Sequence, residues 1–273
     1  MGNLGHFMVI LAFVSALVSA VSYFYYTRAS ELDKPSWKNF SRITFYIHGF
    51  AAVSIAACLF EIIYNHRFEY FYAYSHSSKG LPVHYMISSF WEGQEGAFIL
   101  WIFWDVVLGL IIIHTNKFWE GPVMLVFALV QAFLVSMILG VVIGDLKIGS
   151  SPFMLLRDVS EAPIFQINPE YVPEDGTGLN PLLQNIWMVI HPPTLFLGYA
   201  SSLGYLLCHD FRHGNHNGGL LGLCDLEFRR LLELGSSWKC GIRAMVNHGS
   251  SYTYHDHLQK KQHCTENIHD TGH

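Results

Sequence analysis

The segment AFILWIFWDVVLGLIIIH, residues 97–114, decides the fold class, because Asp105 is its only acidic or basic residue apart from the terminal histidine. An apolar helix of this length matches the roughly 20 residues needed to cross a bilayer. Four further apolar runs accompany it, at residues 4–26, 43–64, 122–143 and 186–207. The chain is 51% hydrophobic and only 14% charged, unlike an ordinary soluble domain. The sequence therefore predicts an all-α, polytopic membrane bundle with about five transmembrane helices.

The distribution of charge predicts the orientation of these helices. Four basic residues follow the first run, whereas residues 144–185 contain two basic and six acidic residues. Because basic loops remain in the cytoplasm, we expect the N-terminus and residues 65–96 and 144–185 on the outer side. The first run lacks the basic flank and cleavage site of a signal peptide, so we expect a retained helix. The basic residues are Arg28, Lys34, Lys38 and Arg42.

The outer loop before the third run is rich in tryptophan, acid and glycine. If this stretch is helical, Glu92 and Glu95 share a face, and Gly93 and Gly96 at the same spacing allow close backbone approach or ligand contact. Acidic residues also suit a solvated helix N-terminus without any chemistry. Interfacial anchoring is the simplest interpretation of the nearby tryptophans, Trp91, Trp101 and Trp104.

The last run contains His191 followed directly by Pro192 and Pro193. Two prolines remove two backbone donors, and proline is tolerated in the first turn of a helix. We therefore expect residues 193–207 to be helical, with His191 just before the helix at the outer surface. A neutral imidazole there can ligate a metal or haem iron, although such a histidine can equally be a plain interfacial residue.

Two long segments carry a resemblance to a known family. LPVHYMISSFWEGQEGAFILW, residues 81–101, resembles the L-P-x-x-Y…W-G-x-x-E-G-S-x-L-L-W segment of the haem lyase family of cytochrome c biogenesis, the CcmF/NrfE-like proteins. GLNPLLQNIWMVIHPPTLFLGYA, residues 178–200, resembles its D-L-N-P-L-L-Q…H-P-P-x-L-Y-x-G-Y segment. The departures are Glu92, Gln94 and Ala97 in the first segment. The resemblance extends over roughly residues 4–207, with both motifs on the predicted outer face.

The resemblance implies a haem-handling protein of the bacterial cytoplasmic (inner) membrane. Members receive haem outside this membrane and attach it to apocytochrome c, so the implied cofactor is non-covalent haem b. The implied partners are a haem-delivery chaperone, apocytochrome c and other maturation proteins, with no nucleic acid. By its H-P-P context, His191 matches an axial ligand of the haem iron. The supporting motif residues are Trp91, Gly93, Glu95, Gly96, Asn180, Pro181, Pro192 and Pro193.

The composition changes after Leu207, and we divide the chain into a membrane region, 1–207, and a polar tail, 208–273. The tail holds nine of the 16 histidines and four of the five cysteines. Codons compatible with residues 224–246, read one base later, encode a segment similar to the tryptophan-rich W-x-W-D loop of the family. We therefore interpret the tail as frame-shifted and irregular, and the chain as an incomplete member that is not an active lyase alone.

Two other interpretations remain open. One is a metal-binding tail, although no familiar zinc spacing is present. The other is a small proton-linked transporter or quinone-interacting subunit, in which Glu61 or His48 handles protons and Asp105 lies near a helix centre. The candidate tail ligands are Cys208, His209, His213, His216, Cys224, Cys240, His255, His257, His263 and Cys264.

Overall fold

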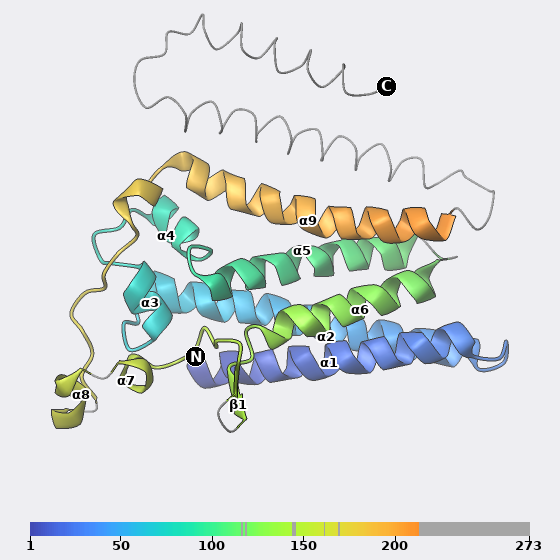
Figure 1. Cartoon of the computed structure of the whole chain (residues 1–273), viewed down its shortest axis with the longest axis horizontal. Coiled ribbons are helices and arrows are strands. Elements are labelled where there is room, and N and C mark those ends of the chain that lie inside the picture. The colour runs from blue at the N-terminus through green and yellow to red at the C-terminus, as the bar shows by residue number, and fades with distance from the viewer. Residues whose placement is uncertain (116, 118, 144–145, 161, 169, 213–273) are drawn as a thin grey trace, which may run out of the picture. The chain divides into compact units, whose positions relative to one another are not determined.

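The computed structural model describes residues 1–212, except 116, 118, 144, 145, 161 and 169 (Figure 1). Its long helices lie side by side, and the short elements gather at one end of them (Figure 1). The elements in chain order are α1 (Gly2–Arg28), α2 (Lys34–Tyr64), α3 (Phe71–His76), α4 (Val83–Ser89), α5 (Gln94–Thr115), α6 (Glu120–Ser136), β1 (Val141–Ile143), β2 (Leu146–Ile148), α7 (Leu156–Val159), α8 (Pro163–Ile167), the 3-10 turn η1 (Pro181–Leu183) and α9 (Ile186–Arg212).

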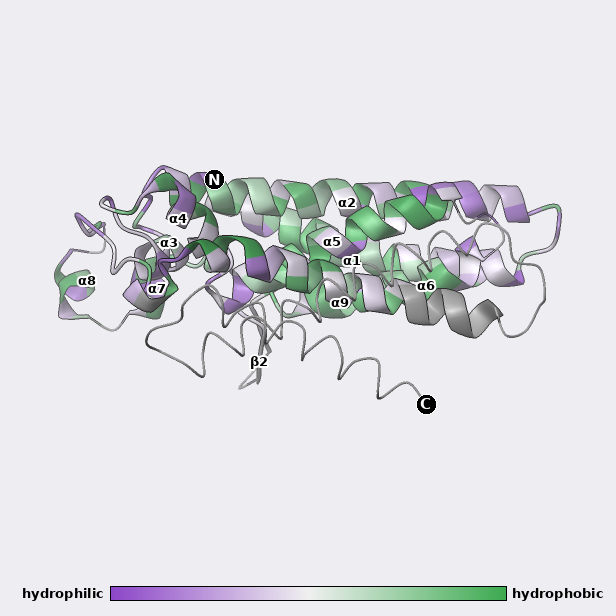
Figure 2. Ribbon diagram, turned by 90° about the horizontal axis from the view of Figure 1, so that it is seen from above, coloured by the Kyte–Doolittle hydropathy of each residue, from purple (hydrophilic) through white to green (hydrophobic). Residues whose placement is uncertain are grey.

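The predicted helical membrane bundle is confirmed, since every predicted apolar run forms a helix. Within the described residues, α1, α2 and α5 are long and apolar enough to cross a membrane, and α6 is a shorter apolar helix. Hydrophobic residues cover the middle parts of these helices, whereas hydrophilic residues concentrate at the two ends of the bundle (Figure 2). The fourth span was predicted to reach residue 143, but α6 ends at Ser136 and residues 141–143 form β1.

Helix α1 packs through a face of small side chains. Its buried residues recur at spacings of three and four and are mostly small: Gly2, Gly5, Val9, Ala12, Ala16 and Ser19. The opposite face is apolar but open, as at Phe7, with 57% of its surface exposed. Small residues between helices with large apolar residues outside are typical of membrane bundles, because lipid solvates the outer side chains and close backbone approach stabilises the interface.

A buried ion pair joins α2 to α6 at one end of the bundle. Glu120 is fully buried, and its two carboxylate oxygens accept hydrogen bonds from Arg42 Nε at 2.5 Å and Nη2 at 2.7 Å. Lys38 Nζ lies 3.3 Å from the same carboxylate. Arg42 also donates to the Ile113 carbonyl at the end of α5. These basic residues were predicted to face the cytoplasm. They belong to the first part of α2, which lies at the end opposite α3 and α4 (Figure 1).

The two predicted outer loops do lie at the same end. Leu156 donates its backbone N–H to the Glu69 carbonyl, and Phe71 donates to the Met154 carbonyl. The β1–β2 hairpin is antiparallel, with Val141 opposite Ile148. At the start of α1, the Gly2 N–H donates to the Tyr70 hydroxyl at 3.0 Å. The N-terminus therefore belongs to the same end as both loops.

The expected helix start at residue 193 is wrong. Helix α9 begins at Ile186, so His191 lies within the helix and Pro192 and Pro193 are inside it. The helix also continues to Arg212, past the proposed boundary at Leu207. Residues 213–273 lie outside the described part of the chain, and with them most of the candidate tail ligands and the region interpreted as frame-shifted.

Candidate functional site

The two family-like segments meet at the end of the bundle that carries the short helices. Before the second segment, Asp175 accepts a hydrogen bond from the Lys79 N–H at 2.8 Å. Thr177 and Gly178 donate their N–H groups to the carbonyls of Tyr74 and Ser77. Gly178 has a φ of +79°, a conformation that side chains with a Cβ rarely adopt. These bonds hold the segment from residue 175 onward against the end of α3.

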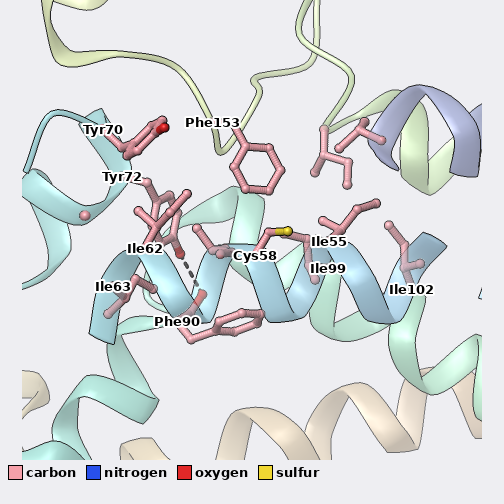
Figure 3. Close-up of a cluster of buried hydrophobic side chains, with 14 of the residues drawn as sticks. Ile55, Cys58, Ile62, Ile63, Tyr70, Tyr72, Phe90, Ile99, Ile102 and Phe153 are labelled. Atoms are coloured by element: carbon pink, nitrogen blue, oxygen red, sulfur yellow. Dashed lines mark hydrogen bonds between the residues drawn. The ribbon is translucent and has the colours of Figure 1, made fainter. Parts of the chain in front are cut away.

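The glycines of the WEGQEG stretch allow the backbone to pass close to Tyr72, a residue that the sequence did not single out. Its hydroxyl donates to the Phe90 carbonyl at 2.7 Å (Figure 3) and accepts from the Gly93 N–H at 3.2 Å. A Cβ on Gly93 would lie 2.6 Å from the Tyr72 ring, and one on Gly96 would overlap the Phe90 carbonyl oxygen. Close backbone approach, one of two roles considered, is thus what these glycines provide.

Trp91 connects the first segment directly to α9. Its indole Nε1 donates to the Met188 carbonyl at 2.9 Å. In a regular helix that carbonyl would accept from the N–H of residue 192, four positions later. Residue 192 is proline and has no N–H. Trp91 therefore supplies the donor that Pro192 removes, which explains how α9 accommodates a proline one residue after His191.

Glu92 approaches the second segment from the turn before α5. It receives a backbone hydrogen bond from Asn180, while its Oε2 atom has no hydrogen-bond partner among the described residues. Burial raises the pKa of the Glu92 carboxyl, and the nearby His76 and the Asn180 N–H oppose that increase. The expected common helical face of Glu92 and Glu95 is wrong, because α5 begins only at Gln94. Glu95 lies in the first turn of α5.

His76 is the second residue of this site that sequence reasoning missed. Its ring stacks on Tyr72, with centroids 4.4 Å apart, and its Nδ1 lies 3.0 Å from the Tyr72 carbonyl. Burial is the main cause that raises the pKa of the Tyr72 hydroxyl. The Tyr-x-x-x-His spacing in YFYAYSH, residues 70–76, was the available signal, because residues four apart share a helix face.

His191 lies on α9 about one turn beyond the Met188 carbonyl that Trp91 holds. Its side chain is partly buried, and no hydrogen bond to its ring is found among the described residues. The nearby Trp187 and Ile190 on the same helix are 40% and 42% exposed. An imidazole with available nitrogens beside open apolar side chains fits the edge of a haem, whose surface is largely apolar.

Three other residues that the sequence singled out have roles in the packing and turns of the fold. Trp101, predicted as an interfacial anchor, packs on Phe196 and Tyr199 of α9, with ring centroids 6.0 and 5.6 Å apart. Pro181 begins the exposed turn η1. His48 Nδ1 lies 2.9 Å from the Ala12 carbonyl, which confirms the expected contact with a neighbouring helix.

The position of Glu61 weakens the interpretation of the chain as a proton-linked transporter. Glu61 lies near the end of α2, where its carboxylate accepts from the Asn65 side chain at 3.0 Å and lies 3.7 Å from Arg67. This is a paired position near a helix end, unlike that of a proton-handling group in mid-membrane.

Comparison with known proteins shows that the chain is similar to cytochrome c-type biogenesis proteins. No family model matches the chain. It is 32% identical to the cytochrome c-type biogenesis protein CcmF of Haemophilus influenzae over 152 residues, 55% of this chain and 21% of that protein. It is 29% identical to CcmF of Pseudomonas aeruginosa over 255 residues, 93% of this chain and 35% of that protein. The latter match extends past Leu207, and the chain spans only about a fifth to a third of these relatives.

A solved structure, cytochrome c haem lyase CcmF, shares the fold with a TM-score of 0.55 and 18% identity, covering 76% of this chain and 29% of that one. The shared fold and the apolar helices α1, α2 and α5 define a helical bundle of the membrane class. Over part of the relatives' length, the chain is similar to the CcmF/NrfE-like family of cytochrome c-type biogenesis proteins.

Proposed function

We propose that this chain handles haem for cytochrome c biogenesis, with His191 as an axial ligand of non-covalent haem b at the outer face of the bacterial cytoplasmic membrane. The hydrogen bond between Trp91 and the Met188 carbonyl carries the proposal. It joins the two family-like motifs and holds the helix turn that bears His191. The kinship with the CcmF proteins supports the same function.

The residues around His191 suit this role. When bound, haem supplies an iron with axial positions that accept imidazole nitrogen. His191 would provide that nitrogen, and the open side chains of Trp187 and Ile190 would cover part of an apolar ring. Trp91 would act at a distance by fixing the backbone of α9. Haem delivered by a chaperone and passed to apocytochrome c must remain accessible, and this position at the end of the bundle provides access.

We expect the chain alone to hold haem weakly and not to act as a lyase. Within the described residues, no group of three or more His, Cys, Asp or Glu side chains is arranged to hold a metal ion. His76, at the same end, already contacts Tyr72 and Ser75. A single imidazole without an enclosing pocket gives up much of the affinity that burial and a second ligand supply.

Titration of haemin into the purified full chain in detergent tests the proposal. We expect a histidine-ligated absorption spectrum that His191→Ala abolishes and that added imidazole strengthens in the unsubstituted protein, by occupying the second axial position. His84→Ala is the matched control, because His84 is an exposed histidine of α4 at the same end of the bundle. Equal haem binding by the His191→Ala and unsubstituted proteins would refute His191 as the ligand.

A further inference from the structure

Two acidic side chains are fully buried in the bundle, and their surroundings differ sharply. Glu120 is paired with Arg42 and Lys38. Asp105, in the third apolar run, is equally buried, yet neither carboxylate oxygen has a hydrogen-bond partner among the described residues. A buried acid kept for stability is paired, because an uncompensated charge in apolar surroundings is costly. Asp105 is therefore a candidate for a function that needs an unpaired carboxyl group.

Helix geometry places Asp105 between α9 and α6. At 3.6 residues per turn, it lies about 40° around α5 from Trp101 and about 60° from Ile102. Trp101 packs on Phe196 and Tyr199 of α9. The Ile102 carbonyl accepts a hydrogen bond from Gln131 Nε2 of α6 at 3.1 Å. Asp105 consequently faces the seam where these three helices meet.

The same level of the bundle contains other polar atoms without partners. Trp101 packs on both Phe196 and Tyr199, and α5 and α9 run side by side in the same direction (Figure 1). Asp105, one turn beyond Trp101, is therefore near the level of the fully buried Ser201. On α2, a Cβ on Gly49 would lie 3.0 Å from Val106, so His48 is also at this level. Buried atoms lacking partners among the described residues are Asp105 Oδ1 and Oδ2, Gln131 Oε1, His48 Nε2, Ser201 Oγ and Trp101 Nε1.

Within this set His48 interacts with the Gln131 side chain, whereas the Asp105 carboxylate, Ser201 Oγ and Trp101 Nε1 have no hydrogen-bond partner among the described residues. The Trp101 N–H can only donate, whereas a hydroxyl such as that of Ser201 and a protonated carboxyl group both donate and accept. Water both donates and accepts, and it occupies buried sites that offer two to four polar partners. Bound water, together with an exchangeable proton on Asp105, would give these unsatisfied groups hydrogen-bond partners.

We propose that Asp105 is a proton-binding site in the middle of the membrane bundle, connected by water to Gln131, Ser201 and His48. On the helices packed against α5, the titratable group at this level is His48 on α2. Tyr199 of α9 lies about half a turn from this level, toward the end of the bundle that carries α3 and α4. Glu120 of α6 and its basic partners lie about 16 Å away along that helix, and Glu61 is near the far end of α2.

Infrared spectroscopy of the full chain in lipid nanodiscs, without haem, tests this site. We expect the spectrum of the unsubstituted protein minus that of Asp105→Asn to show one C=O stretching band of a protonated carboxyl group. The band should shift to lower frequency in D₂O, because the proton exchanges. Glu31→Gln, at an exposed acid, is the control and should leave the band unchanged.

Either of two results would overturn the proposal. Absence of the band would mean that Asp105 is ionised, and a band that never shifts in D₂O would mean a sealed structural acid. If Asp105→Asn does not fold, Asp105→Glu provides the second comparison and should move the band without abolishing it. No haem is present, so the outcome is independent of the role proposed for His191.

Discussion

Replacing Trp91 by phenylalanine tests whether this indole substitutes for the donor that Pro192 removes. The change keeps an aromatic ring but deletes the N–H that bonds the Met188 carbonyl at 2.9 Å. Loss of one partly buried hydrogen bond, with the carbonyl left unsatisfied, should cost about 1–2 kcal/mol. That cost corresponds to a roughly 5- to 30-fold increase in the population in which the start of α9 is open.

The Pro192→Ala background supplies the matched control. Alanine restores the N–H of residue 192, so the Met188 carbonyl regains a donor within α9. The Trp91→Phe substitution should then have a much smaller effect, and the difference between the two backgrounds measures the coupling between the motifs.

Hydrogen–deuterium exchange with mass spectrometry on peptides covering residues 186–199 measures both effects. We expect Trp91→Phe to accelerate exchange about 5- to 30-fold in the natural background, and only slightly in the Pro192→Ala background. An equal acceleration in the two backgrounds would show that the indole acts by packing alone and would refute the substitution of donors.

Three further predictions concern two residues near this site and the ion pair at the opposite end of the bundle. Gly96→Ala forces a methyl group onto a backbone carbonyl and should lower stability by roughly 3 kcal/mol, whereas Gly80→Ala, with nothing within 4 Å, should be tolerated; thermal unfolding of both variants measures this. Because the pKa of Glu92 is raised, the folded state binds its proton more tightly than the unfolded state. Stability should therefore fall as pH rises from the usual carboxyl range through the raised value, and Glu92→Gln should flatten that dependence of melting temperature on pH. Glu120→Gln should lower unfolding stability by about 2 kcal/mol, because two cations, each about a quarter exposed, lose a buried partner; an unchanged denaturation midpoint would argue against a stabilising role.

Patterns among residues that are close together in the sequence were sufficient to predict much of the fold. The helix containing residues 97–114 and the helix α1 follow from apolar length, because any backbone in lipid must satisfy its hydrogen bonds internally. The charges around Arg28 and Lys34 predict which end of the bundle faces the cytoplasm, and that orientation stays a prediction. The end of α6 was misplaced, since residues 137–143 are as apolar as the helix before them and hydropathy contains no stop signal there.

The candidate site was predictable only where one residue type carries the chemistry. His191 and Pro192 stood out by sequence, but the start of α9 did not. Rules for a proline in a helix assume that the lost bond goes unreplaced, and here the donor, Trp91, is 97 residues away from Met188. Tyr72 and His76 were missed for a related reason: their importance lies in contacts with Phe90 and Gly93 rather than in any local motif.

The sequence by itself determined that this protein is a membrane helical bundle with two family-like motifs at one end, because hydropathy and motif spacing are properties of contiguous residues. Only the tertiary structure decided how those motifs meet. Trp91 bonds a carbonyl freed by Pro192, Glu120 finds two cations, and Asp105 finds no partner among the described residues. Each outcome depends on which side chains from distant segments share a small buried volume, and in that volume the presence or absence of a single partner determines the energy of a polar group.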